Sequence, residues 1–217
     1  MDIKQFFSSL AVKLIQRFGP RTVAVDGKIY VISRAVFNPK FYGTSTFMAE
    51  HIDVTPEDDV LDIGTGAGIQ AVTAAQNARK VVAVDINPEA VQCAEANVQR
   101  NGVSHIVTVL QGDLFSPLNP QEKFDVILFT PPYFEGTVRE DFDHALYDPA
   151  KTLAERFFRE AIRYLKHKGY VQMVYSSLAD PESVLKIAGE LGWHYHVVAE
   201  KPLRFERLFV YRLNLNC

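Results

Sequence analysis

The sequence predicts an α/β protein built on a largely parallel sheet with helices on both faces. From Thr44 onward, β-rich apolar runs alternate with stretches of helical periodicity, which is the pattern of βαβ units. A glycine-rich turn directly follows the first of these strands. Only residues 201–205 separate the last two predicted strands. Because this gap is too short for a crossover, we expect the final strand to be antiparallel.

The N-terminal segment is predicted to form a helix followed by a hairpin. Apolar residues recur at spacings of three and four over 1–18, and Gly19-Pro20 ends the pattern. This stripe is expected to pack on its own domain, and a membrane-surface helix is the alternative. Asp26-Gly27 between the β-rich runs 22–25 and 28–32 indicates a hairpin. We therefore expect an N-terminal helix and hairpin extension over 1–42 and one domain over 43–217.

The elements of this domain follow from periodicity and from turn residues. Apolar residues at helical spacing predict helices over about 44–52, 69–77, 88–101, 149–167 and 181–191. Short runs rich in β-branched and aromatic residues predict strands over 59–63, 80–84, 106–110, 124–130, 170–175, 194–200 and 206–213.

The composition is that of an ordinary globular protein, with 47% hydrophobic and 23% charged residues among 217. It excludes disordered, collagen-like and coiled-coil chains, and the length fits one compact domain. There is no run of 18 uncharged apolar residues and no apolar secretory signal, so no membrane span is expected. Two cysteines, Cys93 and Cys217, cannot form a disulfide framework, and zinc would need a ligand cluster that is absent. The simplest location is the cytoplasm.

The most informative segment is Val60-Leu61-Asp62-Ile63-Gly64-Thr65-Gly66-Ala67-Gly68. Glycines in such a turn let the backbone approach a ligand, and the helix that follows offers free N–H groups. A dinucleotide site would need the spacing Gly-x-Gly-x-x-Gly, whereas the spacing here is Gly-x-Gly-x-Gly. Asp62 would repel a pyrophosphate but would favour the ammonium group of an amino-acid ligand.

Acidic residues also lie at the ends of the next two strands. Asp85 ends the second strand, where a carboxylate can accept hydrogen bonds from both hydroxyls of a ribose. Asp113 follows the third strand and could accept a hydrogen bond from an adenine amine. Together with the glycine turn, these residues predict a site for an adenosine-containing ligand at the carboxyl ends of the strands.

With these features the chain resembles the class I S-adenosylmethionine-dependent methyltransferases over roughly residues 36–213. The resemblance implies a Rossmann-like, seven-stranded, mostly parallel sheet with an antiparallel last strand. It implies that Asp62, Gly64 and Gly66 line the methionine end of S-adenosyl-L-methionine. Asp85 would hold the ribose, while Ile86 packs on the adenine and Asp113 binds its amine. The expected cofactor-binding residues are Asp62, Gly64, Thr65, Gly66, Gly68, Asp85, Ile86, Asp113 and Leu114.

The second motif, Thr130-Pro131-Pro132-Tyr133, ends the fourth strand. Two prolines fix the backbone and remove two N–H donors, so free carbonyl groups face the ligand crevice. Such a rigid turn suits a planar nitrogen group that must be held by its N–H bonds. The mechanism is then mainly alignment of this nitrogen with the activated methyl group, which needs no strong base.

The motif resembles the Asn/Asp-Pro-Pro-Tyr/Phe sequence of amino-methyltransferases. By this resemblance, Thr130 and the Pro131 carbonyl bind the substrate amine, Pro132 keeps the turn and Tyr133 stacks on the planar group. Thr130 departs from the family pattern, because its hydroxyl reaches less far than an asparagine amide oxygen. This departure puts the substrate assignment in doubt more than methyl transfer itself.

The substrate is left open between several classes. Phe37-Asn38-Pro39 followed by Gly43-Thr44 resembles the segment before the fold in two subgroups, release-factor glutamine methyltransferases and ribosomal RNA methyltransferases of the small-domain type. An RNA base or a ribosome-associated target is placed first and the glutamine of a release-factor-like protein second. A small-molecule amine or catechol-like acceptor comes third, and a cofactor-binding module without activity is the remaining class. His144 and Tyr147 lie in the following loop and could form a lid.

The distribution of charge is the reason for placing RNA first. Residues 1–42 hold seven basic residues against Asp2 and Asp26, a balance of +5, whereas the whole chain carries −3. A second basic set is expected on the helix over 149–167, and such clusters are typical of phosphate contacts. The loop after the proline motif is acidic, which argues against RNA. The second basic set comprises Lys151, Arg156, Arg159, Arg163, Lys166 and Lys168.

Overall fold

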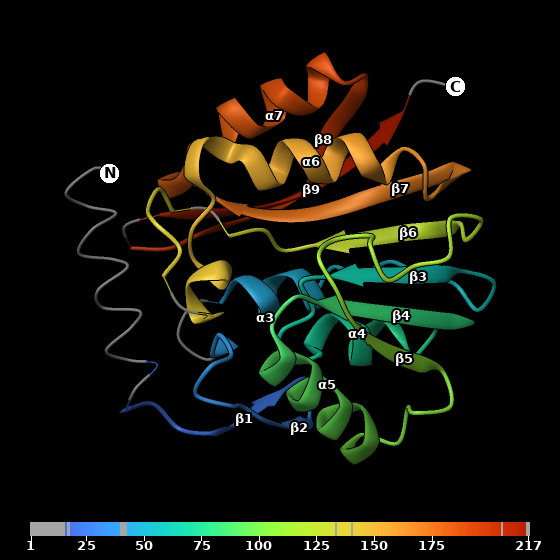
Figure 1. Ribbon diagram of the computed structural model, residues 1–217, viewed down its shortest axis with the longest axis vertical. Helices are drawn as coiled ribbons and strands as arrows, with labels where there is room; N and C mark the ends of the chain where they lie inside the picture. Colours follow the sequence, from blue (N-terminus) through green and yellow to red (C-terminus); the bar gives the residue numbers. More distant parts are fainter. Residues whose placement is uncertain are drawn as a thin grey trace.

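The computed structural model describes residues 16, 18–39, 43–132, 134–139, 141–204 and 206–215. Over these residues its centre is a seven-stranded sheet with the order β5-β4-β3-β6-β7-β9-β8 (Figure 1). The neighbouring strands from β5 to β7 pair in parallel, and β9 is antiparallel to both β7 and β8. The expected α/β fold with an antiparallel last strand is therefore confirmed. The strands are β3 (Asp59–Ile63), β4 (Lys80–Asp85), β5 (Val107–Gln111), β6 (Phe124–Phe129), β7 (Leu165–Ser176), β8 (Trp193–Pro202) and β9 (Arg207–Leu215).

Alternating residues of the strands fill two apolar cores, one on each face of the sheet. In β3, Val60 packs in the core with α3, α4 and α5, whereas Leu61 and Ile63 pack in the core with α6 and α7. This division follows from the period of two of a strand. Because both faces are covered, the parallel strands are mostly apolar along their centres. The helices are α3 (Thr44–Ala49), α4 (Ile69–Ala74), α5 (Pro88–Arg100), α6 (Thr152–Ala161) and α7 (Pro181–Glu190).

The expected hairpin is present and packs beside α5 (Figure 1). Strands β1 (Thr22–Val25) and β2 (Lys28–Val31) pair antiparallel around Asp26-Gly27, whose φ angles of 48° and 72° are left-handed. Asn97 of α5 bonds both the N–H and the carbonyl group of Val31, at 2.8 and 2.9 Å. Apart from Gln16 and Phe18, the predicted helix over 1–18 lies outside the described residues. The division of the chain at residues 42 and 43 stays a prediction.

The bounds predicted for the long helix, 149–167, are wrong at both ends. A 3-10 turn, η2 (Pro149–Lys151), precedes α6, and α6 ends at Ala161. The chain then joins the sheet, because Leu165 pairs with Phe124 of β6. Lys166 bonds the carboxylates of Asp59 and Asp125 at 3.1 and 2.7 Å, which holds this segment at the start of β3 and β6. Tertiary contacts therefore override helical periodicity here.

Two further 3-10 turns lie between the strands, η1 (Asp141–Ala145) and η3 (Ser177–Ala179). The other expected elements are present, although α3 and α4 end at Ala49 and Ala74, about three residues earlier than periodicity predicts. In the described part of the chain, no helix has the length and apolar character needed to cross a membrane.

Candidate active site

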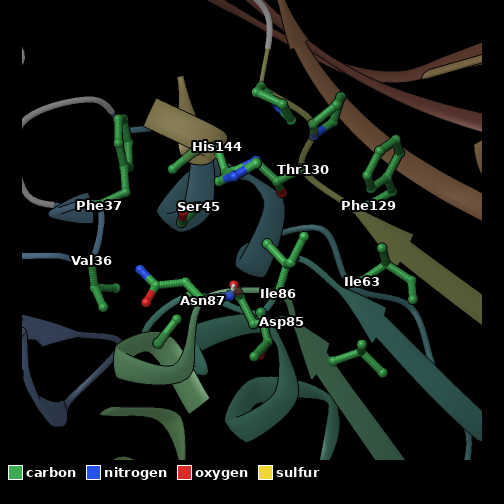
Figure 2. A pocket seen from close by; sticks show the side chains of 18 of the residues that line it. Val36, Phe37, Ser45, Ile63, Asp85, Ile86, Asn87, Phe129, Thr130 and His144 are labelled. Atoms are coloured by element: carbon green, nitrogen blue, oxygen red, sulfur yellow. Dashed lines mark hydrogen bonds between the residues drawn. The ribbon is translucent and has the colours of Figure 1, made fainter. Parts of the chain in front are cut away.

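A cavity of about 270 Å³ opens at the carboxyl ends of β3, β4, β5 and β6. This is the edge at which open parallel sheets bind their ligands. Figure 2 shows Val36 and Phe37 on one side of the cavity and Ile63 on the other. Asp85 and Thr130 lie at opposite ends in the same view. Two turns that the sequence places far apart thus contribute to one space.

The glycine turn forms part of the wall through Gly64, Thr65 and Gly66. Gly64 and Gly66 have φ angles of 72° and 56°, which residues with side chains adopt at a cost. The N–H groups of Gly64 and Thr65 both donate to the Val84 carbonyl, at 2.9 and 3.0 Å. These bonds draw the turn over the end of β4 and bring its backbone beside Asp85.

Asp85 is held by the backbone on both of its oxygens. Oδ2 accepts from the Gly66 N–H at 2.8 Å, and Oδ1 accepts from the Asn87 N–H at 2.9 Å. Burial raises the pKa of the Asp85 carboxyl, and these hydrogen bonds oppose the rise. Next to it, the Ile86 side chain is 41% exposed and lines the cavity. A fixed carboxylate beside an uncovered apolar side chain fits a nucleoside, with its hydroxyls on Asp85 and its base on Ile86.

Asp62 and Gly68 are not among the residues that line the cavity. Asp62 is 1% exposed, and its Oδ2 accepts from the Thr65 hydroxyl at 2.6 Å, so it supports the turn from below. Burial, reinforced by the charge of Asp85, raises the pKa of Asp62 to about 7. Gly68 has a φ angle of 79°, and a Cβ atom there would lie 3.3 Å from Ala94 of α5. Their contacts with the cofactor stay predictions.

Asp113 and Leu114 line the cavity after β5. Oδ2 of Asp113 lies 2.8 Å from Arg156 of α6, and both side chains are about half exposed. This partner was not expected from the sequence. The second Asp113 oxygen has no hydrogen-bond partner in the described part of the chain, so it remains able to accept the predicted adenine amine.

The proline turn closes the opposite end of the cavity with Thr130, Pro131 and Pro132. Tyr133, expected to stack on the substrate, lies outside the described residues. Among the described residues, no hydrogen bond engages the Pro131 carbonyl. The Thr130 hydroxyl accepts from Gln70 Nε2 at 2.9 Å. Gln70 is the second residue of α4 and was missed, because its place in an apolar helical run gives no sign of a site.

A segment before the sheet, residues 35–39, covers one side of the cavity through Ala35, Val36, Phe37 and Pro39. Asn87 Nδ2 donates to the Ala35 carbonyl at 2.9 Å. Gln16 Nε2 donates to the Arg34 carbonyl at 2.9 Å, and its Oε1 accepts from the Asn38 N–H at 3.1 Å. The sequence marks Phe37-Asn38-Pro39 but gives no signal for Gln16.

The loop after the proline turn folds back over the cavity. His144 and Ala145 of η1, with Leu146, belong to its lining. An isolated bridge joins Phe134 to Tyr147, and the Phe134 N–H donates to the Leu146 carbonyl at 2.9 Å. His144 therefore lines the cavity, whereas Tyr147 does not, and the expected lid stays a prediction.

The basic residues expected on one helix are not all on it, and several are paired with acidic side chains. Lys166 pairs with Asp59 and Asp125, and Lys151 is buried and pairs with Glu135 at 3.3 Å. Arg159 pairs with Glu155 at 2.7 Å. Since α6 ends at Ala161, residues 163, 166 and 168 are not on the helix at all. The expectation that this whole set lies on one helix is therefore wrong, and its role in binding phosphate stays a prediction.

The fold and this cavity define an S-adenosylmethionine-dependent methyltransferase. The chain belongs to the methyltransferase small domain family, whose model matches residues 31–202. Its cofactor is S-adenosyl-L-methionine, which supplies a methyl group already activated on a sulfonium. Asp85 and Ile86 fit the nucleoside of this cofactor, and the glycine turn fits its close approach to the backbone.

Two relatives cover most of the chain. A putative protein N5-glutamine methyltransferase of Methanocaldococcus jannaschii is 38% identical over 159 residues, which are 70% of this chain and 79% of that protein. A release factor glutamine methyltransferase of Geobacter sulfurreducens is 30% identical over 197 residues, which are 84% of this chain and 67% of that protein. Another release factor glutamine methyltransferase, from Rhodopirellula baltica, is 49% identical but is matched over 27% of its length.

Solved structures share the fold at low sequence identity. The tRNA m1G37 methyltransferase of M. jannaschii is 17% identical with a TM-score of 0.64, over 90% of this chain and 56% of that one. A ribosomal protein L11 methylase of Lactobacillus delbrueckii subsp. bulgaricus is 20% identical with a TM-score of 0.59, over 80% of this chain and 78% of that one. These structures support the fold and do not identify an acceptor.

Proposed function

We propose that the protein transfers a methyl group from S-adenosylmethionine to the side-chain amide nitrogen of a glutamine in a release-factor-like protein. The observation that carries the proposal is the proline turn at one end of the cavity, opposite Asp85. Its free Pro131 carbonyl suits a planar N–H₂ group. A glutamine amide has this shape. The relatives that cover most of the chain carry names of protein glutamine methyltransferases, which favours this acceptor over an RNA base.

The chain's own residues act by holding and aligning. Asp85, Ile86 and the glycine turn would fix the cofactor at one end of the cavity. Thr130 and the Pro131 carbonyl would orient the N–H₂ group at the other end, while Pro132 keeps the turn rigid. Orientation of this kind can lower a barrier by about 7–11 kcal/mol. No described carboxylate is needed as a base, since the amide proton can pass to water.

The expectation that placed RNA first is not supported by a specific feature of the site. Four members of its second basic set form ion pairs, namely Lys151, Arg156, Arg159 and Lys166. Of the first basic set, Lys4, Lys13, Arg17 and Lys40 lie outside the described residues. Methylation of RNA is therefore treated as one possible outcome of the assay described next. The cytoplasmic location expected from the sequence belongs to the same proposal.

The test is a methyl-transfer assay with radiolabelled S-adenosylmethionine and a cell extract, divided between ribonuclease and protease digestion. We expect label that survives ribonuclease, is lost with protease, and appears on purified release factor. When the glutamines of the release factor are replaced one at a time, only one replacement should abolish the label. Label lost with ribonuclease would contradict the proposal in favour of RNA. Cofactor binding without macromolecular label would instead indicate a small-molecule acceptor or an inactive module.

A further inference from the structure

Gln70 occupies an unusual place for a buried amide. It is 3% exposed, it is the second residue of α4, and it lines the cavity. Its Nε2 donates to the Thr130 hydroxyl at 2.9 Å, across a separation of 60 residues in sequence. This bond joins α4, which follows the glycine turn, to the proline turn, as the adjacent positions of β3 and β6 in the sheet allow.

The amide oxygen of Gln70 takes no part in this hydrogen bond. A glutamine carries an acceptor oxygen and two N–H donors, and only one donor is used by Thr130. Within the described part of the chain, no hydrogen bond reaches the Gln70 oxygen. The Gln70 oxygen is not among the fully buried, unpaired side-chain atoms of the described residues, so it can be reached from the cavity that Gln70 lines. It is therefore free to accept a hydrogen bond from a donor that enters the cavity.

A planar N–H₂ group presents two N–H donors, and the turn offers the Pro131 carbonyl as one acceptor. The Thr130 hydroxyl already accepts from Gln70 with one of its two lone pairs, and it reaches less far than the asparagine oxygen of the family motif. The Gln70 oxygen, two bonds from the nitrogen that holds Thr130, is the next acceptor within the same cavity wall.

We infer that the Gln70 amide oxygen is the second hydrogen-bond acceptor for the methyl-accepting N–H₂ group, with Thr130 fixing the orientation of the amide. Gln70 is then a substrate-contacting residue that compensates for the short side chain at position 130. The inference rests on the proposed function only in that the acceptor is a planar N–H₂ group. It holds equally for a glutamine amide and for an exocyclic base amine.

The decisive variant is Gln70→Met, which keeps the length of the side chain and removes both polar atoms. We expect kcat/KM for methyl transfer to fall roughly 10- to 100-fold, as for a hydrogen bond whose partner is left unpaired. The Kd for S-adenosylmethionine should stay within about twofold, because a hydrogen bond to the acceptor is not made in the cofactor complex. Gln76→Met is the matched control, since Gln76 is exposed just after α4 and its side chain bonds only the Val72 carbonyl among the described residues.

A second substitution separates substrate contact from a structural role. Thr130→Asn in the Gln70→Met background places an amide oxygen at the proline turn itself. We expect it to restore activity by roughly tenfold, the effect of one hydrogen bond. Unchanged activity of Gln70→Met would overturn the inference. So would an equal loss of activity and of cofactor affinity without rescue, which would indicate damage to the fold around α4.

A binding measurement distinguishes this inference from the proposed function. In the presence of S-adenosylhomocysteine, N-acetylglutamine amide should shift the side-chain amide resonances of Gln70 in nitrogen-15 NMR spectra. Absence of the shift at saturating probe would overturn the inference, whether or not the release factor is methylated. If wild-type protein labels RNA instead of protein, the proposed function fails, whereas the activity ratio of Gln70→Met to wild type on that RNA still tests Gln70.

Discussion

The two ends of the cavity are held together by different kinds of contact. At the glycine-turn end, Gly66, Asp85 and Asn87 are joined by backbone N–H groups that donate to one carboxylate. At the proline-turn end, Thr130 is held by the side chain of Gln70 from another element. The contacts at the glycine-turn end depend on the identity of one side chain, Asp85. A contact between two side chains depends on both identities, so the proline-turn end is where acceptor specificity can change by few substitutions.

The largest effect is expected for Asp85→Ala, which breaks the glycine-turn end. It removes the predicted ribose acceptor and leaves the Gly66 and Asn87 N–H groups without their partner. Hydrogen bonds to charged groups contribute about 1.5–3 kcal/mol each, so the Kd for S-adenosylmethionine should rise roughly 100-fold or more. Titration calorimetry measures it. Asp58→Ala is the control, because Asp58 also accepts two hydrogen bonds, both from Thr55, but outside the cavity. Similar affinities of the two variants would refute the assignment.

The second prediction concerns the pH dependence of the free energy of unfolding, which should reflect the Asp62 carboxyl group beneath the glycine turn. Burial raises the pKa of Asp62 from 3.8 to about 7, so the folded protein binds more protons than the unfolded chain between these values. The free energy of unfolding should therefore fall as pH rises through this window and level off above it. From about pH 5 to about pH 7 the fall should be about 2 kcal/mol larger in wild type than in Asp62→Asn. Urea unfolding at several pH values measures this difference, and equal slopes would contradict it.

A third substitution tests whether Gly68 serves packing more than the cofactor. In Gly68→Ala, the left-handed φ angle and the contact with Ala94 should lower the free energy of unfolding by about 1–2 kcal/mol. Cofactor affinity should change little, because Gly68 does not line the cavity. Gly189→Ala is the matched control in α7, where a Cβ meets open space and should stabilise by about 0.5–1 kcal/mol. A large loss of affinity in Gly68→Ala, measured by calorimetry, would place Gly68 in the cofactor site.

The smallest effect is expected for Arg156→Ala. The pair between Arg156 and Asp113 is half exposed, so its loss should lower the free energy of unfolding by less than about 1 kcal/mol. The difference from wild type should shrink further at high salt. Urea unfolding at two salt concentrations measures both. A loss that is larger and independent of salt would show that α6 is tied to the end of β5 more firmly than a surface ion pair allows.

Sequence reasoning succeeds where a feature is local. The glycine turn, the acidic strand ends and the antiparallel β9 follow from residues close together in the chain, and the structure brings the first two to one edge of the sheet. The end of α6 could not be predicted in this way. Leu165 pairs with Phe124 of β6 and Lys166 meets Asp59 across 107 residues, so contacts distant in sequence place a helix-like segment in β7. The roles of Gln70 and Gln16 were missed for the same reason, since each depends on a partner from a distant segment.

The single tryptophan of the sequence lies deep in the core shared by α6, α7 and the sheet. Trp193 is 2% exposed, its Nε1 donates to the Phe158 carbonyl at 3.2 Å, and it does not line the cavity. An indole in such surroundings emits at shorter wavelength than one in water. Its fluorescence should therefore change when this core is lost during unfolding and stay unchanged when a ligand fills the cavity. Stability can thus be followed in an unlabelled sample by a signal that the occupancy of the cavity does not change.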